Sequence, residues 1–134
     1  MPSLDVLHHR GPDTNGRWSE QIGGKTVNLI HNRLSIIDLS EAGKQPMTSE
    51  DGNYVLVYNG EIYNYLQLRD QYFPGAQWKG HSDTELLLRL LTDKGMDALP
   101  LLNGDFAFAF IDKKNARMFL VRDRFGIKPL YYWN

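Results

Sequence analysis

The segment from Gly104 to Ile111 constrains the fold of this chain more than any other part of the sequence. It reads Gly-Asp-Phe-Ala-Phe-Ala-Phe-Ile, so large and small apolar residues alternate along it. Successive side chains of a β-strand point to opposite faces of the sheet, so the phenylalanines would fill one face while the alanines let a second layer approach the other. The segment therefore predicts a strand that is covered on both faces.

Four other segments have the apolar composition of strands: Lys25 to His31, Tyr54 to Tyr58, Met118 to Val121, and Leu130 to Trp133. Between the last two, Gly126 and Pro129 indicate a turn. Asn59-Gly60 follows the second segment, and this dipeptide is the strongest short-range signal for a hairpin, because both residues tolerate positive φ. A turn there exposes a backbone N–H and a side-chain amide. Two alternatives therefore stand for it, a plain chain reversal and a site that holds a negative group.

Two helices are predicted from their N-terminal caps. Asn64 is followed three residues later by Gln67, and Ser82 with Glu85 makes the fuller capping box. Gly95 supplies the C-terminal stop of the second helix, whose apolar face consists of Leu86, Leu87, Leu90 and Leu91. Helices mixed with hairpin-like strands favour an α+β domain in which helices pack outside antiparallel sheet.

Composition limits the class of protein. A chain of 134 residues with 42% hydrophobic residues can bury one core, and its net charge of -1 argues against nucleic acid as a partner. No apolar run approaches the roughly 18 residues of a membrane span, and no signal peptide is evident, so we expect a cytoplasmic protein without a membrane partner. Cysteine is absent, which removes disulfides, thiolate metal sites and thiol nucleophiles.

Several polar residues are candidates for a site. His8 and His9 raise the question of a metal, but adjacent side chains on extended chain point opposite ways and no further ligand is suitably spaced, so we expect none. Arg10 with Asp13, around Gly-Pro, either braces a turn or lines a site.

Arg33 and Asp83 make a complementary pair of candidates. Arg33 lies among apolar neighbours, and a buried guanidinium needs an anion, either an internal carboxylate or a ligand carboxylate held bidentately. Asp83 lies in the first turn of a predicted helix, where the helix dipole alone can explain it, or where it can bind an ammonium group. Together the two would hold an α-amino acid.

Seven motifs in this order resemble the class II glutamine amidotransferase domain of glutamine-hydrolysing asparagine synthetases, and they cover nearly the whole chain: residues 9–13, 33–38, 45–46, 58–64, 81–85, 103–109 and 122–132. The resemblance implies an N-terminal-nucleophile αββα sandwich, with two antiparallel sheets between helical layers. It implies hydrolysis of L-glutamine to glutamate and ammonia, which passes to an ATP-activated aspartate. ATP and Mg²⁺ would belong to a C-terminal synthetase domain, and the amidotransferase domain itself would need no cofactor or metal.

The resemblance also implies roles for single residues. Arg33 matches the residue that holds the glutamine α-carboxylate, and Asp83, helped by Glu61, matches the carboxylate that receives the α-ammonium. Asn59 through its amide and Gly60 through its N–H match the oxyanion hole, and Asp38–Met47 corresponds to a loop that closes over glutamine. The implied substrate-binding set is Arg33, Leu34, Ser35, Ile36, Ile37, Asn59, Gly60, Glu61 and Asp83.

The sequence departs from the family at its ends. The family's nucleophile is an N-terminal cysteine, whereas this sequence starts with Met1-Pro2-Ser3-Leu4 and stops at Asn134. We therefore expect residues 1–134 to be a partial amidotransferase domain, truncated at both ends, without a synthetase domain and inactive alone. A missing first strand would leave an open edge that pairs in a homodimer, or poor order in the N-terminal residues and the Asp38–Met47 loop. Alternatives are a nucleophile-free glutamine-binding or structural module, and an amidotransferase with a sugar or peptide acceptor.

Overall fold

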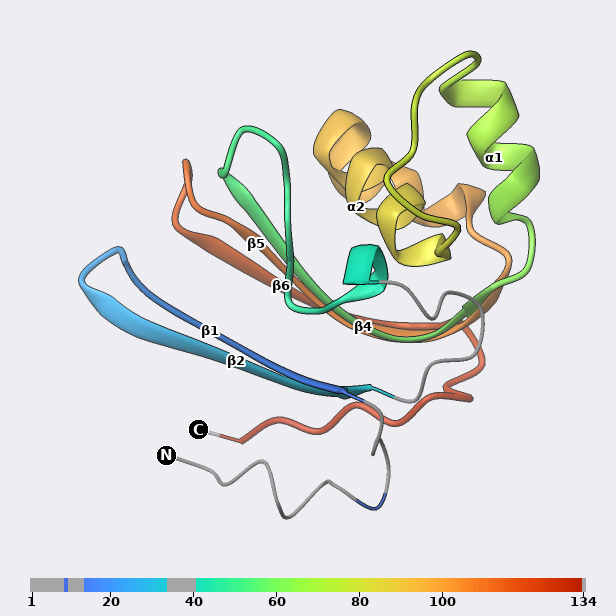
Figure 1. Cartoon of the computed structure of the whole chain (residues 1–134). Coiled ribbons are helices and arrows are strands. Elements are labelled where there is room, and N and C mark those ends of the chain that lie inside the picture. Colours follow the sequence, from blue (N-terminus) through green and yellow to red (C-terminus); the bar gives the residue numbers. More distant parts are fainter. Residues whose placement is uncertain (1–8, 10–13, 34–40, 134) are drawn as a thin grey trace.

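A computed structural model describes residue 9 and residues 14–33 and 41–133 (Figure 1). The strands form two antiparallel sheets, a hairpin of β1 and β2 and a four-stranded sheet in the order β3-β4-β5-β6. The strands are β1 (Thr14–Ile22), β2 (Lys25–Arg33), β3 (Met47–Thr48), β4 (Tyr54–Ile62), β5 (Gly104–Asp112) and β6 (Arg117–Arg122). The helices are α1 (Tyr65–Tyr72) and α2 (Asp83–Lys94), with 3₁₀ turns η2 (Glu41–Gly43) and η3 (Gly95–Leu101).

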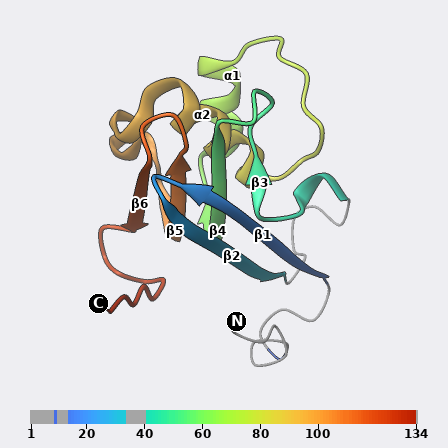
Figure 2. The same ribbon diagram turned by 90° about the vertical axis from the view of Figure 1, so that its left-hand side faces the viewer.

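The two sheets and the helices form layers. Helices α1 and α2 lie on one face of the four-stranded sheet, and the β1–β2 hairpin lies along the other (Figures 1 and 2). This arrangement confirms the α+β class with stacked antiparallel sheets. Within the described residues both α-helices cover the same side, so the second helical layer of the implied sandwich is not seen in this part of the chain. No described helix has the length and apolar character needed to cross a membrane.

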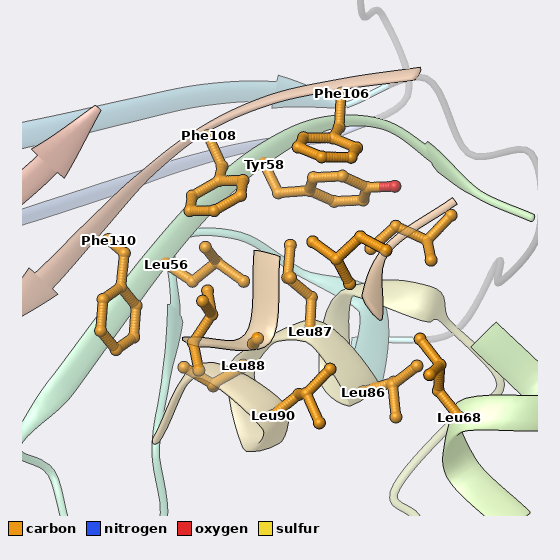
Figure 3. Packing of buried hydrophobic residues seen from close by; sticks show 14 residues of the cluster. Leu56, Tyr58, Leu68, Leu86, Leu87, Leu88, Leu90, Phe106, Phe108 and Phe110 are labelled. Atoms are coloured by element: carbon orange, nitrogen blue, oxygen red, sulfur yellow. The ribbon is translucent and has the colours of Figure 1, made fainter. Parts of the chain in front are cut away.

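The predicted alternation of β5 is confirmed, because each of its faces is buried by a different layer. Phe106, Phe108 and Phe110 pack against the leucines of α2 in the larger core cluster (Figure 3). On the other face, Ile111 joins Val55 of β4 and Leu29 of the hairpin in a second cluster. The sheet that carries β4 and β5 is therefore held between two apolar layers, which fixes the position of its edges.

Helix α2 begins and ends where predicted. The Ser82 hydroxyl accepts the Glu85 N–H at 3.4 Å, and Gly95, at φ +60°, ends the helix. The return half of the capping box is not formed, because the Glu85 carboxylate instead accepts the N–H groups of Lys79 and Gly80 in the preceding loop. The four predicted leucines, Leu86, Leu87, Leu90 and Leu91, are all buried.

Helix α1 begins after Asn64, as predicted, but without a capping bond from that side chain. The Asn64 amide instead bridges the chain to the start of β5, because it donates to the Leu101 carbonyl at 2.9 Å and accepts the Asn103 N–H at 3.0 Å.

Two sequence-based predictions about strands are wrong. Asn59-Gly60 is no hairpin turn, because both residues lie inside β4, opposite Ala107 and Phe106 of β5. The glycine serves a close approach of strands instead: at φ +148° a Cβ on Gly60 would overlap the Asp105 carbonyl oxygen, and one on Gly104 would overlap that of Glu61.

The second wrong prediction is the strand from Leu130 to Trp133, which the structure shows as irregular chain. Tyr131 and Trp133 are 85% and 90% exposed, so within the described residues this segment has no covering layer of the kind that buries β5. Strand β1 was not predicted at all, since its residues are mostly polar.

Candidate active site

Three backbone N–H groups of β4, those of Tyr58, Gly60 and Ile62, point away from β5. They lie along the edge of β4 where β3 no longer pairs with it. The Tyr58 N–H donates to Gln45 Oε1 at 2.6 Å, and the Ile62 N–H donates to Asp83 Oδ2 at 2.9 Å. Gly60 lies between them and faces Phe106, whose own N–H and carbonyl both bond Asp123 on the opposite side of β5. Pairs in an antiparallel ladder alternate, so the Gly60 N–H is directed to the same edge as those of Tyr58 and Ile62.

Asp83 brings a carboxylate to this edge from the first residue of α2. It is buried, with 4% exposure, and its Oδ2 accepts the Tyr58 hydroxyl at 2.6 Å and the Ile62 N–H at 2.9 Å. The N-terminal end of a helix favours a negative charge. Burial, followed by the charge of Asp83, raises the pKa of Tyr58, so its hydroxyl stays protonated and acts as a donor. The structure thus joins Asp83 to the strand that carries Asn59 and Gly60.

Asn59 and Glu61 are exposed and alternate along β4 with the buried Tyr58 and Ile62. By the period of a strand they share the face of Val55 and Val57, which the β1–β2 hairpin covers. The Asn59 side chain therefore lies on the hairpin face of β4, while Asp83 reaches the edge of the same strand from the helical side.

Arg33 is the last residue of β2, and its side chain lies outside the described part of the structure. Leu29 of β2 packs with Val55 of β4, and the two strands run in the same direction in Figure 1. Arg33 follows Leu29 by four residues, as Asn59 follows Val55, so the two strands bring both predicted site residues to the same end of the sandwich.

Several predicted site residues lie outside the described residues. These are Leu34, Ser35, Ile36 and Ile37 of the implied pocket wall, residues 38–40 of the implied lid, and His8, Arg10 and Asp13. In the part of the chain that the structure does describe, no three His, Asp or Glu side chains gather as metal ligands would.

A second buried carboxylate, Asp123, directly follows β6 and bonds Phe106 of β5 on the side away from β4. Asp123, 5% exposed, holds the turn after β6, and its Oδ1 accepts the N–H groups of Phe125 and Ile127 at 3.1 and 3.0 Å. Its Oδ2 accepts those of Phe106 and Lys128 at 3.2 and 3.0 Å. These bonds, that from Lys128 foremost, lower the pKa of Asp123 to about 2.

Sequence reasoning missed the roles of Gln45, Tyr58 and Asp123. For Asp123 a local signal exists, because an aspartate just before a Gly- and Pro-containing turn often bonds the N–H groups of that turn. For Tyr58 none exists, because its partner lies 25 residues away along the chain.

The fold defines the class of protein. Among solved structures the chain is similar to glutamine phosphoribosylpyrophosphate amidotransferase from B. subtilis, complexed with ADP and GMP. The TM-score is 0.72 at 23% sequence identity, with 94% of this chain and 34% of that chain covered. At this identity the likeness shows the fold, which is the one that the resemblance implied.

The family follows from the sequence. A family model described as a glutamine amidotransferase domain matches residues 1–134, so the chain belongs to the glutamine amidotransferase domain family. It is 42% identical over 130 residues to "Amidase chry2" of Gibberella zeae, with 97% of this chain and 19% of that protein covered. It is 39% identical over 142 residues to "Putative asparagine synthetase [glutamine-hydrolyzing] 2" of Methanocaldococcus jannaschii, with 96% and 27% covered. The chain thus spans about a fifth to a quarter of these relatives.

Proposed function

We propose that this chain forms the glutamine-binding and oxyanion-stabilising part of a glutamine-hydrolysing asparagine synthetase. In that reaction glutamine is hydrolysed to glutamate and ammonia, and ammonia passes to an ATP-activated aspartate. The observation that carries the proposal is the placement of the buried Asp83 carboxylate at the strand edge to which Gly60 directs its N–H. The similarity to an amidase supports cleavage of an amide bond, and the similarity to an asparagine synthetase supports the acceptor.

Glutamine binding divides the substrate's two charges between two residues. Asp83 receives the α-ammonium, since its carboxylate is buried and its partners among the described residues are neutral donors, which leave its charge for a cation. Arg33, at the end of β2, holds the α-carboxylate as a charge-assisted pair, and Leu34, Ser35, Ile36 and Ile37 line the pocket. Glu61 adds negative charge on the ammonium side.

Asn59 and Gly60 stabilise the charge that develops on the amide oxygen during attack. The side-chain amide of Asn59 and the N–H of Gly60 are donors on a strand that is held by its ladder to β5 and by the buried side chains of Tyr58 and Ile62. Donors that are fixed before the reaction contribute roughly 3 to 4 kcal/mol of transition-state stabilisation.

The nucleophile, cofactors and partners complete the proposal. The chain contains no cysteine, so we expect these 134 residues alone to release no ammonia from glutamine. Ammonia released above a heat-treated control, and lost in Asn59→Ala, would contradict this.

We assign ATP and Mg²⁺ to a C-terminal synthetase domain, which is the proposed partner in a longer protein. We place that protein in the cytoplasm, and we propose that it forms a homodimer through open strand edges.

Calorimetric titration with L-glutamine tests the proposal. We expect binding with a dissociation constant on the order of 1 mM, no binding of D-glutamine at the same concentrations, and no binding to Arg33→Ala. Arg117→Ala is the matched control, because it removes an arginine from the exposed face of β6. Equal affinity in the unchanged chain and in Arg33→Ala would return Arg33 to an internal salt bridge and contradict the proposed pocket.

A further inference from the structure

Within the described part of the chain, the hydrogen bonds of Asp83 are one-sided. Both the Tyr58 hydroxyl and the Ile62 N–H donate to the same oxygen, Oδ2, at 2.6 and 2.9 Å. Two donors on one oxygen fix the position of that oxygen. They also restrict the rotation of the carboxylate, because hydrogen bonds prefer to lie near its plane. The other oxygen, Oδ1, is then held in a defined direction and can accept from a third group.

Tyr58 is itself held rigidly. Tyr58 is 3% exposed, and its ring packs with Phe106, Phe108 and the leucines of α2 (Figure 3). Its backbone is fixed by the ladder to β5 and by the hydrogen bond from its N–H to Gln45 Oε1 at 2.6 Å. The Gln45 side chain is also buried. The hydroxyl of this buried ring donates to Asp83, as a buried tyrosine hydroxyl needs a partner.

The same strand residue is adjacent to the oxyanion donors. Tyr58 directly precedes Asn59 and Gly60, so the group that orients Asp83 and the groups proposed to bind the amide oxygen are carried by three consecutive residues of β4. A displacement of this strand would move both ends of the substrate site together. Neutral donors also leave the charge of the carboxylate in place for a cation, which an arginine or lysine in the position of Tyr58 would not do.

We propose that Tyr58 is a positioning residue, which orients the Asp83 carboxylate so that Oδ1 receives the α-ammonium of the amino-acid substrate. This inference rests on the proposed function, since it refines how that site selects an α-amino acid. It assigns to Tyr58 a contribution to affinity that depends on the ammonium group of the ligand. A purely structural tyrosine would contribute to the affinity of every ligand of the pocket.

The test compares L-glutamine with 4-carbamoylbutanoate, which is glutamine without its α-ammonium, in NMR titrations of the chain and of Tyr58→Phe. We expect Tyr58→Phe to weaken glutamine binding roughly tenfold and to change the affinity for the analogue by less than about twofold. Tyr63→Phe is the matched control, because it removes a hydroxyl that bonds Asp105 on the exposed surface, and it should change neither affinity.

The outcomes separate the inference from the proposed function. Equal weakening of both ligands, or no weakening of glutamine, overturns the role of Tyr58 while the pocket stands. An unchanged chain that binds no glutamine overturns the proposed function and the inference with it. A measurement that needs no variant follows the hydroxyl proton resonance of Tyr58: it should shift when glutamine binds and stay in place with the analogue, and a resonance that responds to neither ligand contradicts the inference.

Discussion

Two buried aspartates, Asp83 and Asp123, both hold strands of the four-stranded sheet, yet they use their oxygens differently. Asp123 accepts two backbone N–H groups on each oxygen. Among the described residues, Asp83 accepts its two donors on Oδ2, and one of these is a side chain. A carboxylate whose oxygens are all engaged by its own chain supports structure, whereas one with an oxygen to spare has capacity for a ligand. The comparison favours a structural role for Asp123 and the proposed binding role for Asp83.

The largest expected effect is the loss of stability in Asp123→Ala. This change leaves four backbone N–H groups without their acceptor. The N–H of Phe106 is buried in the sheet and cannot recover its bond to water, and the other three lose the contact that holds the turn. We expect the melting temperature to fall by on the order of 10 °C or more. Circular dichroism during heating measures it, with Asp70→Ala on the exposed side of α1 as the control. A variant that melts at the same temperature as the unchanged chain would contradict the structural role of Asp123.

Asp83→Asn should affect binding far more than stability. An asparagine can still accept the Tyr58 hydroxyl and the Ile62 N–H through its amide oxygen, but it carries no charge for an ammonium group. We expect glutamine affinity to fall roughly 10- to 100-fold, with little change in the melting temperature. NMR titration and thermal melting of the same sample check both halves. A large loss of stability with glutamine affinity retained would assign Asp83 to structure.

A fall in pH should remove the electrostatic part of the stability that Asp123 contributes, and this effect is smaller than that of Asp123→Ala. The pKa of Asp123 is lowered to about 2, from an ordinary value of 3.8, by the backbone N–H groups that bond its charged form. A folded-state pKa below the unfolded one means that the carboxylate stabilises the fold above about pH 4, and that this stability is lost as the pH falls from about 4 toward 2. Thermal melts across that range measure the loss.

Asp51 provides the control for the acid experiment. Its pKa is also lowered to about 2, by the Asn53 and Ser49 side chains foremost, in an exposed turn. Asp51→Asn should therefore keep the part of the acid-induced loss that Asp123 causes. Stability that becomes independent of pH in Asp51→Asn would show that Asp123 does not contribute.

The sequence predicted those elements that are determined by residues close together along the chain. The leucines and caps of α2 and the alternation of β5 each follow from residues a few positions apart. The hairpin turn predicted at Asn59-Gly60 was wrong because a glycine can serve either a turn or a close approach of strands. Which of the two it serves depends on β5, more than forty residues away. The resemblance to a family named Asp83 as a site residue. It did not predict Tyr58 as the partner of Asp83, because only the folded sheet and helix bring the two together.

The close approach of Gly60 and Gly104 has a consequence for how this sequence can vary. Each glycine faces a carbonyl of the opposite strand, so a methyl group at either position would collide with main chain. Main-chain atoms cannot turn aside as a flexible side chain can, so the strands themselves would have to separate, and with them the donors that β4 carries. In a library of random variants these two positions should therefore tolerate only glycine, and no single compensating substitution nearby should restore either one.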